Sequence, residues 1–326
     1  MGTVGLTNQD LYAPSIAPNP APLLVVLGPT AAGKSGLALH LARALDGEIV
    51  NCDSVQVYRG LEIGSAKLPL RERRGIPHHL IDIVEPGGEL TAGAYAGLAR
   101  AALGDLKTRG VLPIVAGGTG LYLRALLEGL SPAPPRDPQL RARLNILAAR
   151  RPAALHRFLR RYDPVSATRI HENDHQKLIR AIELTRLAAQ PASRVQSLPR
   201  PALAGFRILQ IGLNPPRRLL QEALDARSEE MFRCGLIEET RALLASGVDP
   251  RAKSLQAIGY KQAVEFLKGQ LPLADALRQC QARTRQYAKR QMTWFRADPA
   301  IQWLSGFGSD PAVQTEALTL ARQFLV

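Results

Sequence analysis

Apolar and polar residues in the first 130 positions follow the order expected of strands that alternate with helices. Residues 23–27 are apolar at every position, and an Ala- and Leu-rich stretch follows at 36–45. Further short strand-like segments lie at 48–53 and 111–116. Strands without polar alternation are buried on both faces, which is typical of parallel sheets covered by helices on two sides. We therefore predict an α/β protein whose first part is a doubly wound parallel sheet.

The middle of the chain has a helical pattern instead. Residues 139–190 show no strand-like alternation, and Pro-rich stretches bound them at 131–138 and 191–201. The apolar residues that recur there at helical spacing are Leu140, Leu144, Leu147, Leu155, Phe158 and Leu159. A strand-like segment at 206–212 then predicts a return to the first sheet. We expect residues 23–130 and 205–326 to form one catalytic core, mainly helical after residue 217, and 131–204 to be an inserted helical domain.

The remaining segments give no sign of export or of membrane insertion. Residues 1–22 contain four prolines and no Lys or Arg, so they lack the basic start of a secretory signal and are predicted to be a disordered leader. No apolar stretch approaches the roughly twenty residues that span a bilayer. Three widely separated cysteines form neither a disulfide framework nor a zinc spacing. We expect the protein to be cytoplasmic and monomeric and to have no membrane partner.

A phosphate-binding loop follows the first strand. Residues 28–35 read Gly-Pro-Thr-Ala-Ala-Gly-Lys-Ser and match G-x-x-x-x-G-K-[ST] between a strand and a helix. Glycine lets backbone N–H groups turn toward phosphate oxygens, the lysine adds a mobile charge, and the hydroxyl of Ser35 can bind Mg²⁺. The residues expected to bind the phosphates are Gly28, Thr30, Ala31, Ala32, Gly33, Lys34 and Ser35. The motif predicts a P-loop NTPase-like fold that binds a diphosphate or triphosphate, and a chance match is the less favoured alternative.

The position of the next carboxylate argues against a motor-type ATPase. Such enzymes need an acid at the end of a later strand to hold Mg²⁺ and organise the attacking water. The strand at 111–116 instead runs into Gly117-Gly118-Thr119-Gly120, whereas Asp53 stands at the end of the strand-like segment at 48–53. The bound phosphates are therefore predicted to be a leaving group, or the part of a donor substrate by which the protein binds it, and not an energy source.

Positive charge is concentrated in the middle segment. Residues 131–204 hold 14 Lys or Arg against 5 Asp or Glu, while residues 1–130 hold 11 of each. These charges could simply form a solvated helical surface, and for any single arginine this is the better interpretation. For the whole segment, contact with a polyanion is favoured.

Taken together, these segments resemble the tRNA dimethylallyltransferase family. The blocks that carry the resemblance are, in chain order, residues 28–35, 53–59, 78–83, 117–122 with 125–130, 173–180, 257–262 and 289–296. Leu68 stands where the family usually has a proline, and no Cys/His pattern supports the C-terminal zinc finger of eukaryotic relatives. The chain is thus most similar to the short bacterial type. The resemblance implies transfer of a dimethylallyl group from dimethylallyl diphosphate to the N6 amine of the adenosine 3′ to the tRNA anticodon.

The resemblance also implies roles for particular residues. Asp53 matches the general base, Thr119 the hydroxyl beside the reacting amine, and Arg227 an arginine that reaches the diphosphate, with Mg²⁺ as cofactor. From the residues alone, Asp53 could instead be a metal ligand or a strand-end cap, Thr119 part of a plain glycine-rich turn, and Arg227 a solvated helical residue. The positions that match tRNA contacts are Asp53, Ser54, Val55, Gln56, Thr119, Arg141, Gln176, Lys177, Leu178, Ile179, Arg180, Gln256, Gly259, Tyr260, Lys261 and Arg290. The target base must leave its stack to react.

Two other classes remain open. A small-molecule or nucleoside kinase would share the phosphate loop and an inserted helical lid, but would not require the positive charge of residues 131–204. A nucleic-acid-binding ATPase would account for that charge, but not for the missing acid after residue 116. Trp294 and Phe295 in the block 289–296 could stack on bases or could belong to the core of an amphipathic helix.

Overall fold

The computed structural model describes residues 20–326, and most of the predicted leader, residues 1–19, lies outside the described residues. The first strand begins at Ala21, so residues 21 and 22, which the leader was expected to include, belong to the sheet. The described chain divides into two compact units. One contains the residues up to Leu90, Leu98–Gly120 and Ala204–Val326, and the other contains Thr91–Gly97 and Leu121–Leu203.

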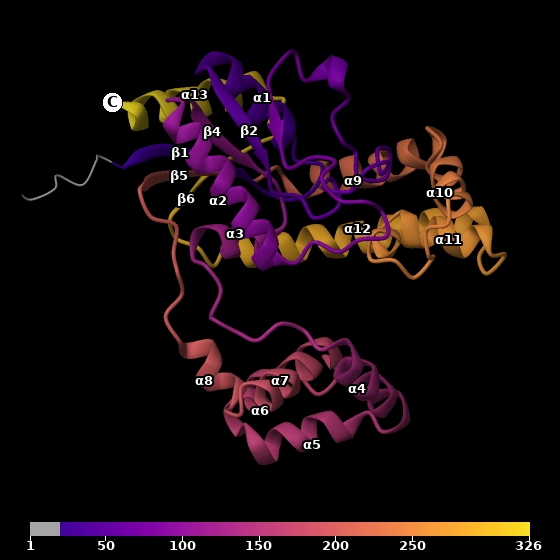
Figure 1. Cartoon of the computed structure of the whole chain (residues 1–326). Helices are drawn as coiled ribbons and strands as arrows, with labels where there is room; N and C mark the ends of the chain where they lie inside the picture. The colour runs from indigo at the N-terminus through magenta and orange to yellow at the C-terminus, as the bar shows by residue number, and fades with distance from the viewer. Residues whose placement is uncertain (1–19) are drawn as a thin grey trace, which may run out of the picture. The chain divides into compact units, whose positions relative to one another are not determined.

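The first unit is built on one parallel sheet (Figure 1). Its strands are β1 (Ala21–Leu27), β2 (Gly47–Asn51), β3 (His78–His79), β4 (Leu112–Ala116), β5 (Phe206–Leu213) and β6 (Ile301–Leu304). They lie in the order β3-β2-β4-β1-β5-β6, and every pairing is parallel. The strand expected at 206–212 is β5, which pairs with β1 over the whole length of β1. The short edge strand β6 was not predicted.

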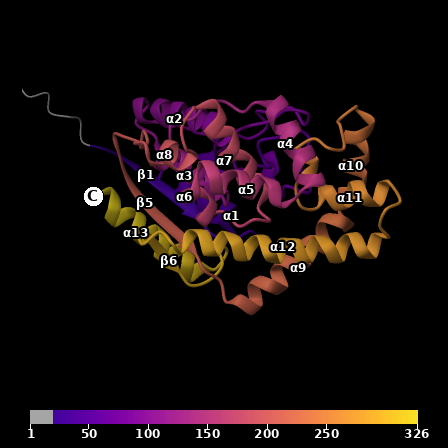
Figure 2. The ribbon, with the colours of Figure 1, turned by 90° about the horizontal axis from the view of Figure 1, so that it is seen from below.

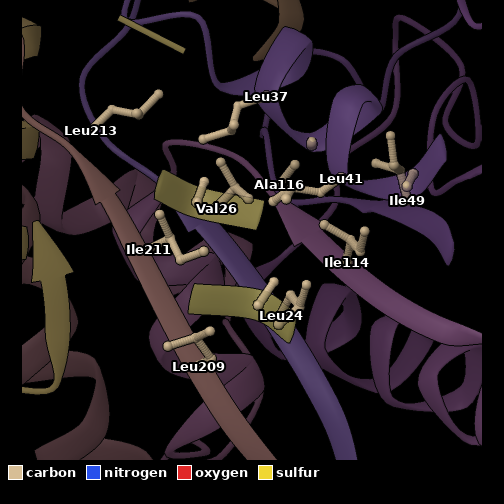
Figure 3. Packing of buried hydrophobic residues seen from close by; sticks show 14 of the residues in the cluster. Leu24, Val26, Leu37, Leu41, Ile49, Ile114, Ala116, Leu209, Ile211 and Leu213 are labelled. Atoms are coloured by element: carbon tan, nitrogen blue, oxygen red, sulfur yellow. The ribbon is translucent and has the colours of Figure 1, made fainter. Parts of the chain in front are cut away.

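Both faces of the sheet are buried, which confirms the doubly wound arrangement. Leu24 and Val26 point to one face and join side chains of α1 (Lys34–Ala44) and α13 (Pro311–Leu325) in a single cluster, part of which Figure 3 shows. Leu23, Val25 and Leu27 alternate with them and point to the other face, where they are no more than 1% exposed. A strand buried on both faces has no room for polar side chains, which explains the apolar run of β1.

Four further helices of this unit lie between β5 and β6 in chain order. They are α9 (Arg217–Arg233), α10 (Leu236–Ala245), α11 (Tyr260–Leu267) and α12 (Leu273–Phe295), and the unit also has the short 3-10 turns η1 (Leu70–Glu72) and η2 (Ser254–Gln256). The helix α2 (Ala92–Thr108) begins in the second unit and continues into the first. Figure 2 shows α9 and α12 side by side, and the two helices are joined by a hydrogen bond from Gln281 to the Asp225 carbonyl. Among the described residues, no helix combines the length and apolar character that crossing a bilayer requires.

The second unit is helical and has its own core. Besides the start of α2 it contains α3 (Gly120–Leu127), α4 (Pro138–Arg150), α5 (Ala153–Tyr162), α6 (Pro164–Arg169), α7 (His175–Leu187) and α8 (Ala192–Ser197). Its buried cluster includes Leu144, Leu155 and Leu159, whereas Leu147, expected to be in the core, is 38% exposed. The unit also takes in residues 91–97 and 121–130, since Tyr95 and Tyr122 stack there with ring centroids 4.2 Å apart.

A buried carboxylate joins three segments of the second unit. Asp163, at 1% exposure, accepts hydrogen bonds from the backbone N–H and hydroxyl of Ser166 and of Ser193. It thereby caps the first turn of α6 and holds the start of α8 against it. These hydrogen bonds hold the pKa of Asp163 below its usual range, although burial opposes them.

Candidate active site

The phosphate loop is shaped by backbone conformations that few residues adopt. Gly28 and Gly33 have φ angles of 145° and 85°, and Ala31 lies in the left-handed region at 61°. Gly33 also needs to be glycine for space, because a Cβ atom there would come within 2.9 Å of the Gly308 nitrogen. Gly308 in turn donates to the Ala32 carbonyl at 2.8 Å. The loop before α13 therefore supports the phosphate loop from behind.

The start of α1, which follows this loop, carries backbone N–H donors and the hydroxyl of Ser35. No acidic residue occupies its first turn, and its N-cap is Gly33, which has no side chain to accept from the backbone. The first N–H groups of such a helix attract anions. The Nζ atom of Lys34 donates to the Pro29 carbonyl at 2.8 Å, while Ser35 is exposed.

Asp53 lies in a turn directly after β2. Its Oδ1 atom accepts from the Val55 nitrogen at 2.8 Å and from the Gln56 nitrogen at 3.3 Å. No described residue donates a hydrogen bond to its Oδ2 atom, which leaves that oxygen available to accept from another molecule. The carboxylate thus caps the turn, as the alternative interpretation expected, and also keeps one oxygen open.

The glycine-rich loop after β4 is packed too tightly for larger residues. A Cβ atom on Gly117 would lie 2.1 Å from the Cys52 carbonyl oxygen, and one on Gly118 would lie 2.3 Å from Nε2 of Gln291. Thr119 donates its N–H to the Cys52 carbonyl at 3.2 Å, and its hydroxyl oxygen accepts from the Ser54 nitrogen at 3.0 Å. This loop therefore lies against the turn that carries Asp53.

These loops surround a cavity of about 380 Å³. Its lining residues are Thr30, Ala31, Gly33, Lys34, Ser35, Gly36, Asn51, Asp53, Gln56, Ala66, Ala116, Gly117, Ala223 and Arg227. The cavity brings together the phosphate loop, Asp53 and Arg227, which the sequence separates widely. Thr119 is not a lining residue, but its hydroxyl contacts Ser54, the neighbour of Asp53.

Charges within the cavity influence one another. The pKa of Lys34 is lowered to about 8, mainly by burial; the nearby Asp53 opposes this shift and Arg227 adds to it. Burial also lowers the pKa of Arg227, and Asp53 again opposes the shift. Two cations and one carboxylate leave an excess of positive charge in this pocket. An anion with several charges, such as a diphosphate, would reduce the repulsion between the two cations.

Two residues of α12 that were not among the predicted site residues line up with this site, although Gln291 lies in the block 289–296. Tyr287 lies near Thr119, and burial together with Asp53 raises the pKa of its phenol to about 12. Gln291 is 6% exposed and contacts both the phosphate loop and the Gly117–Gly118 segment. The block 289–296 contains Gln291, but nothing in the sequence indicates that its side chain contacts Thr30 and Gly118.

The positions expected to contact tRNA in the first unit are not equally accessible. Gln56 lines the cavity, where its Nε2 atom donates to the Ser65 carbonyl at 3.2 Å. Ser54 and Val55 are half-buried beside it, Gln256 is exposed, and Lys261 is half-buried. Tyr260, in contrast, is fully buried: its hydroxyl donates to Glu239 at 2.5 Å and accepts from the Gly64 nitrogen. Gly259, directly before it, is buried too, with a φ angle of 94°.

The block 289–296 divides between interior and surface. Arg290 is exposed, and its guanidinium lies over the Tyr287 ring at 5.8 Å. Phe295 is 2% exposed and belongs to the interior, as the amphipathic alternative expected. Trp294 is 42% exposed, and its indole lies where a Cβ atom on Gly120 would stand. Of the two open interpretations, the helix core therefore holds for Phe295, whereas Trp294 is exposed enough to contact another molecule.

In the second unit, two expected tRNA contacts are held in an ion-pair network. Glu183 is fully buried and accepts from Arg141 at 3.0 Å, from Arg180 at 2.6 Å and from the Asp137 nitrogen at 2.7 Å. Leu178 and Ile179 are buried in the core, so their side chains pack the helix. Gln176 and Lys177 are exposed, and Lys177 pairs with Asp174 at 2.7 Å.

Comparison with known proteins gives one consistent family. The family model described as IPP transferase matches residues 56–298. A tRNA dimethylallyltransferase of Solibacter usitatus is 52% identical over 93% of this chain and 99% of its own length, and one of Koribacter versatilis is 50% identical over 92% and 98%.

Two solved structures are similar over nearly the whole chain. The full-length tRNA isopentenylpyrophosphate transferase of Bacillus halodurans has a TM-score of 0.70 and 34% identity, covering 93% of this chain and 96% of its own. A eukaryotic dimethylallyltransferase described as acting on tRNA has a TM-score of 0.79 and 29% identity, covering 94% and 79%.

Proposed function

We propose, from the premise that the chain belongs to the IPP transferase family, that it transfers a dimethylallyl group from dimethylallyl diphosphate to tRNA. The acceptor is the N6 amine of the adenosine 3′ to the anticodon, and diphosphate is released. The observation that carries this proposal is the cavity that places a phosphate loop, a second cation and a carboxylate around one space. The match to relatives over nearly their full length supports the same activity.

The cationic side of the cavity suits a departing diphosphate. When the C–O bond of the donor breaks, negative charge grows on the diphosphate. Lys34 and Arg227 line the cavity and, together with the first N–H groups of α1, would stabilise that charge. Both cations already stand in the free site, so little reorganisation is needed as the charge develops.

Asp53 is suited to take the proton that the amine loses. The N6 nitrogen forms a bond to the allylic carbon, the bond from that carbon to the diphosphate oxygen breaks, and one N6 proton must leave. Oδ2 of Asp53 is the open oxygen at the cavity, and the hydrogen bonds to Oδ1 fix its orientation. A carboxylate with fixed geometry is an effective general base. Thr119, joined to the Asp53 turn through Ser54, would orient the amine from the neighbouring loop.

The site also fits Mg²⁺ as cofactor. The Ser35 hydroxyl lines the cavity at the start of α1, and the described residues contain no cluster of three His, Cys, Asp or Glu that would form a metal cage. Mg²⁺ commonly takes one or two protein oxygens and completes its coordination with phosphate oxygens and water. Ser35 would hold it, and when bound it would neutralise charge on the diphosphate.

The basic segment 131–204 is proposed to bind tRNA. It holds 14 cationic residues against 5 acidic ones, which supports contact with the phosphate backbone. Gln176 and Lys177 are exposed and belong to the block 173–180 that carries the resemblance. In the first unit, Gln56 lines the cavity, which supports a role for this residue in contacting an extruded base. Phosphate contacts would position the RNA, and the cavity would select the base.

One assay separates this activity from the two alternatives. Purified protein is incubated with bulk tRNA and Mg²⁺, and with either labelled dimethylallyl diphosphate or labelled ATP. We expect label from dimethylallyl diphosphate on the RNA and none from ATP. Phosphoryl transfer from ATP to a small molecule would indicate a kinase, and RNA-stimulated phosphate release from ATP would indicate an ATPase.

A further inference from the structure

One side chain joins the donor loop to the acceptor loop. The Oε1 atom of Gln291 accepts from the backbone nitrogen of Thr30 at 2.9 Å, and its Nε2 atom donates to the carbonyl of Gly118 at 2.7 Å. Thr30 belongs to the phosphate loop, and Gly118 precedes Thr119. A single buried amide therefore spans the loop expected to hold the diphosphate and the loop expected to hold the reacting amine.

The side chain of Gln291 is closely packed against Gly118. Gly118 has no Cβ atom, and one placed there would lie 2.3 Å from Nε2 of Gln291 and 3.4 Å from Nζ of Lys34. The amide thus fills the space above the glycine and lies near the phosphate-loop lysine. Glutamine is suited to this place because its side chain carries one acceptor and one donor group at the same end.

The helix that carries Gln291 contacts the acceptor loop at further points. Tyr287, one turn before Gln291, reaches Thr119, and Trp294, one turn after it, lies against Gly120. This face of α12 therefore runs along residues 118–120. Its fixed helical spacing sets where Thr119 can lie relative to Thr30.

We propose that Gln291 is a positioning residue that sets the distance between the bound diphosphate and the acceptor threonine, and so couples the two substrate sites. This inference rests on the proposed function. Gln291 touches neither reacting group; it acts through the backbone of the two loops that do. The bond-forming atoms must meet at about 3–3.5 Å, and an error of about 1 Å costs on the order of 100-fold in rate.

The first test replaces the amide with an unbranched apolar side chain of similar length. Gln291→Met removes both hydrogen bonds but keeps the volume. The matched control is Gln210→Met on β5, because Gln210 is also buried and donates across elements, to Asp298 at 2.9 Å, away from both loops. Thermal unfolding, the Kd of tRNA and the single-turnover transfer rate with saturating substrates are measured for each variant.

Gln291→Met is expected to lower the single-turnover rate about 10- to 100-fold while tRNA affinity stays within about twofold. Gln210→Met is expected to lose similar thermal stability and to keep the wild-type rate. A rate for Gln291→Met within twofold of the Gln210→Met rate would overturn the proposal, because Gln291 would then support only the fold.

A second variant reaches the same contact from the other side and remains informative if Gln291→Met does not fold. Gly118→Ala leaves the glutamine intact but places a Cβ atom where its Nε2 atom lies; Gly104→Ala on α2, where a Cβ atom meets nothing within 4 Å, is the control. Gly118→Ala should slow transfer by a similar factor, and Gly104→Ala should not. The Gly118→Ala/Gln291→Met double variant should be no slower than the slower single variant, since both break one bridge. Effects that multiply in the double variant would contradict the shared bridge.

The same experiment distinguishes this proposal from the proposed function. Wild-type protein and the Gln210→Met control must both transfer the dimethylallyl group to tRNA. If neither does, the assignment of the reaction fails. If both do and Gln291→Met matches them, only the positioning role fails.

Discussion

Replacing Asp53 with asparagine should stop the chemistry without disturbing the site. Asparagine keeps an Oδ1 atom that can accept from the Val55 and Gln56 nitrogens, so the turn after β2 keeps its shape. Its other atom becomes an NH₂ group, which cannot accept the proton of the reacting amine. The substitution therefore removes the proton acceptor and one negative charge, and little else.

The size of the effect follows from the role assigned to the carboxylate. A positioned general base contributes about 10²- to 10⁴-fold, which corresponds to about 3–5 kcal/mol of activation free energy. Donor binding should not weaken, because Asp53 is a negative charge that acts on both cations, Lys34 and Arg227. Removing it leaves the cavity more attractive to a diphosphate. It also lowers the pKa of Lys34, so binding is compared near pH 6.5, where Lys34 stays protonated.

The assay combines single-turnover transfer to tRNA with separate binding of inorganic pyrophosphate in the presence of Mg²⁺. We expect a rate about 10²- to 10⁴-fold lower for Asp53→Asn, with pyrophosphate affinity equal to or higher than that of the wild type. If the variant instead loses Mg²⁺ or pyrophosphate binding before it loses rate, Asp53 is a metal ligand and the reasoning is refuted.

Three further outcomes follow from the same contacts. Because Lys34 is protonated below a pKa of about 8, pyrophosphate affinity should fall as the pH rises through that value. Titration calorimetry should show that this pH dependence disappears in Lys34→Met. A pH dependence that persists in the variant would assign it to another group. Glu183→Gln should lower the free energy of unfolding, measured in urea, by about 2–3 kcal/mol, since two partly buried arginines lose the charge of their buried partner. A loss below about 0.5 kcal/mol would show that the network adds nothing to stability. Lys177→Gln should reduce the slope of log affinity for tRNA against log salt concentration by about one. The control Arg322→Gln, at an exposed position on α13, should leave that slope unchanged. Equal slopes for the wild type and both variants would show that Lys177 makes no phosphate contact.

Much of the core could be predicted because local sequence determines it. The apolar run of β1, the phosphate loop and the start of α1 are adjacent in sequence, and their burial and backbone demands restrict the residues directly. The strand β6 could not be found in this way. It has four residues, two of them not buried, and it exists because β5 offers an edge to pair with.

The parts of the site that sequence did not give depend on long-range packing. Thr30 and Gln291 are 261 positions apart, and no local pattern relates them. The pairing of Arg141 and Arg180 with Glu183 could not be predicted for the same reason, because the burial of Glu183 follows from the packing of α4 against α7. A test of tRNA binding that neutralises these two arginines would therefore also destabilise the second unit, and Lys177 is the cleaner target.

The most direct measurement of the central claim is the position and stoichiometry of the product. A single tRNA transcript is incubated with labelled dimethylallyl diphosphate, then digested and analysed by mass spectrometry, while pyrophosphate release is counted in the same reaction. We predict one five-carbon addition on the adenosine 3′ to the anticodon, one pyrophosphate released per addition, and no product when that adenosine is replaced by guanosine. Pyrophosphate release without modified RNA, or label on the guanosine-substituted transcript, would contradict the account.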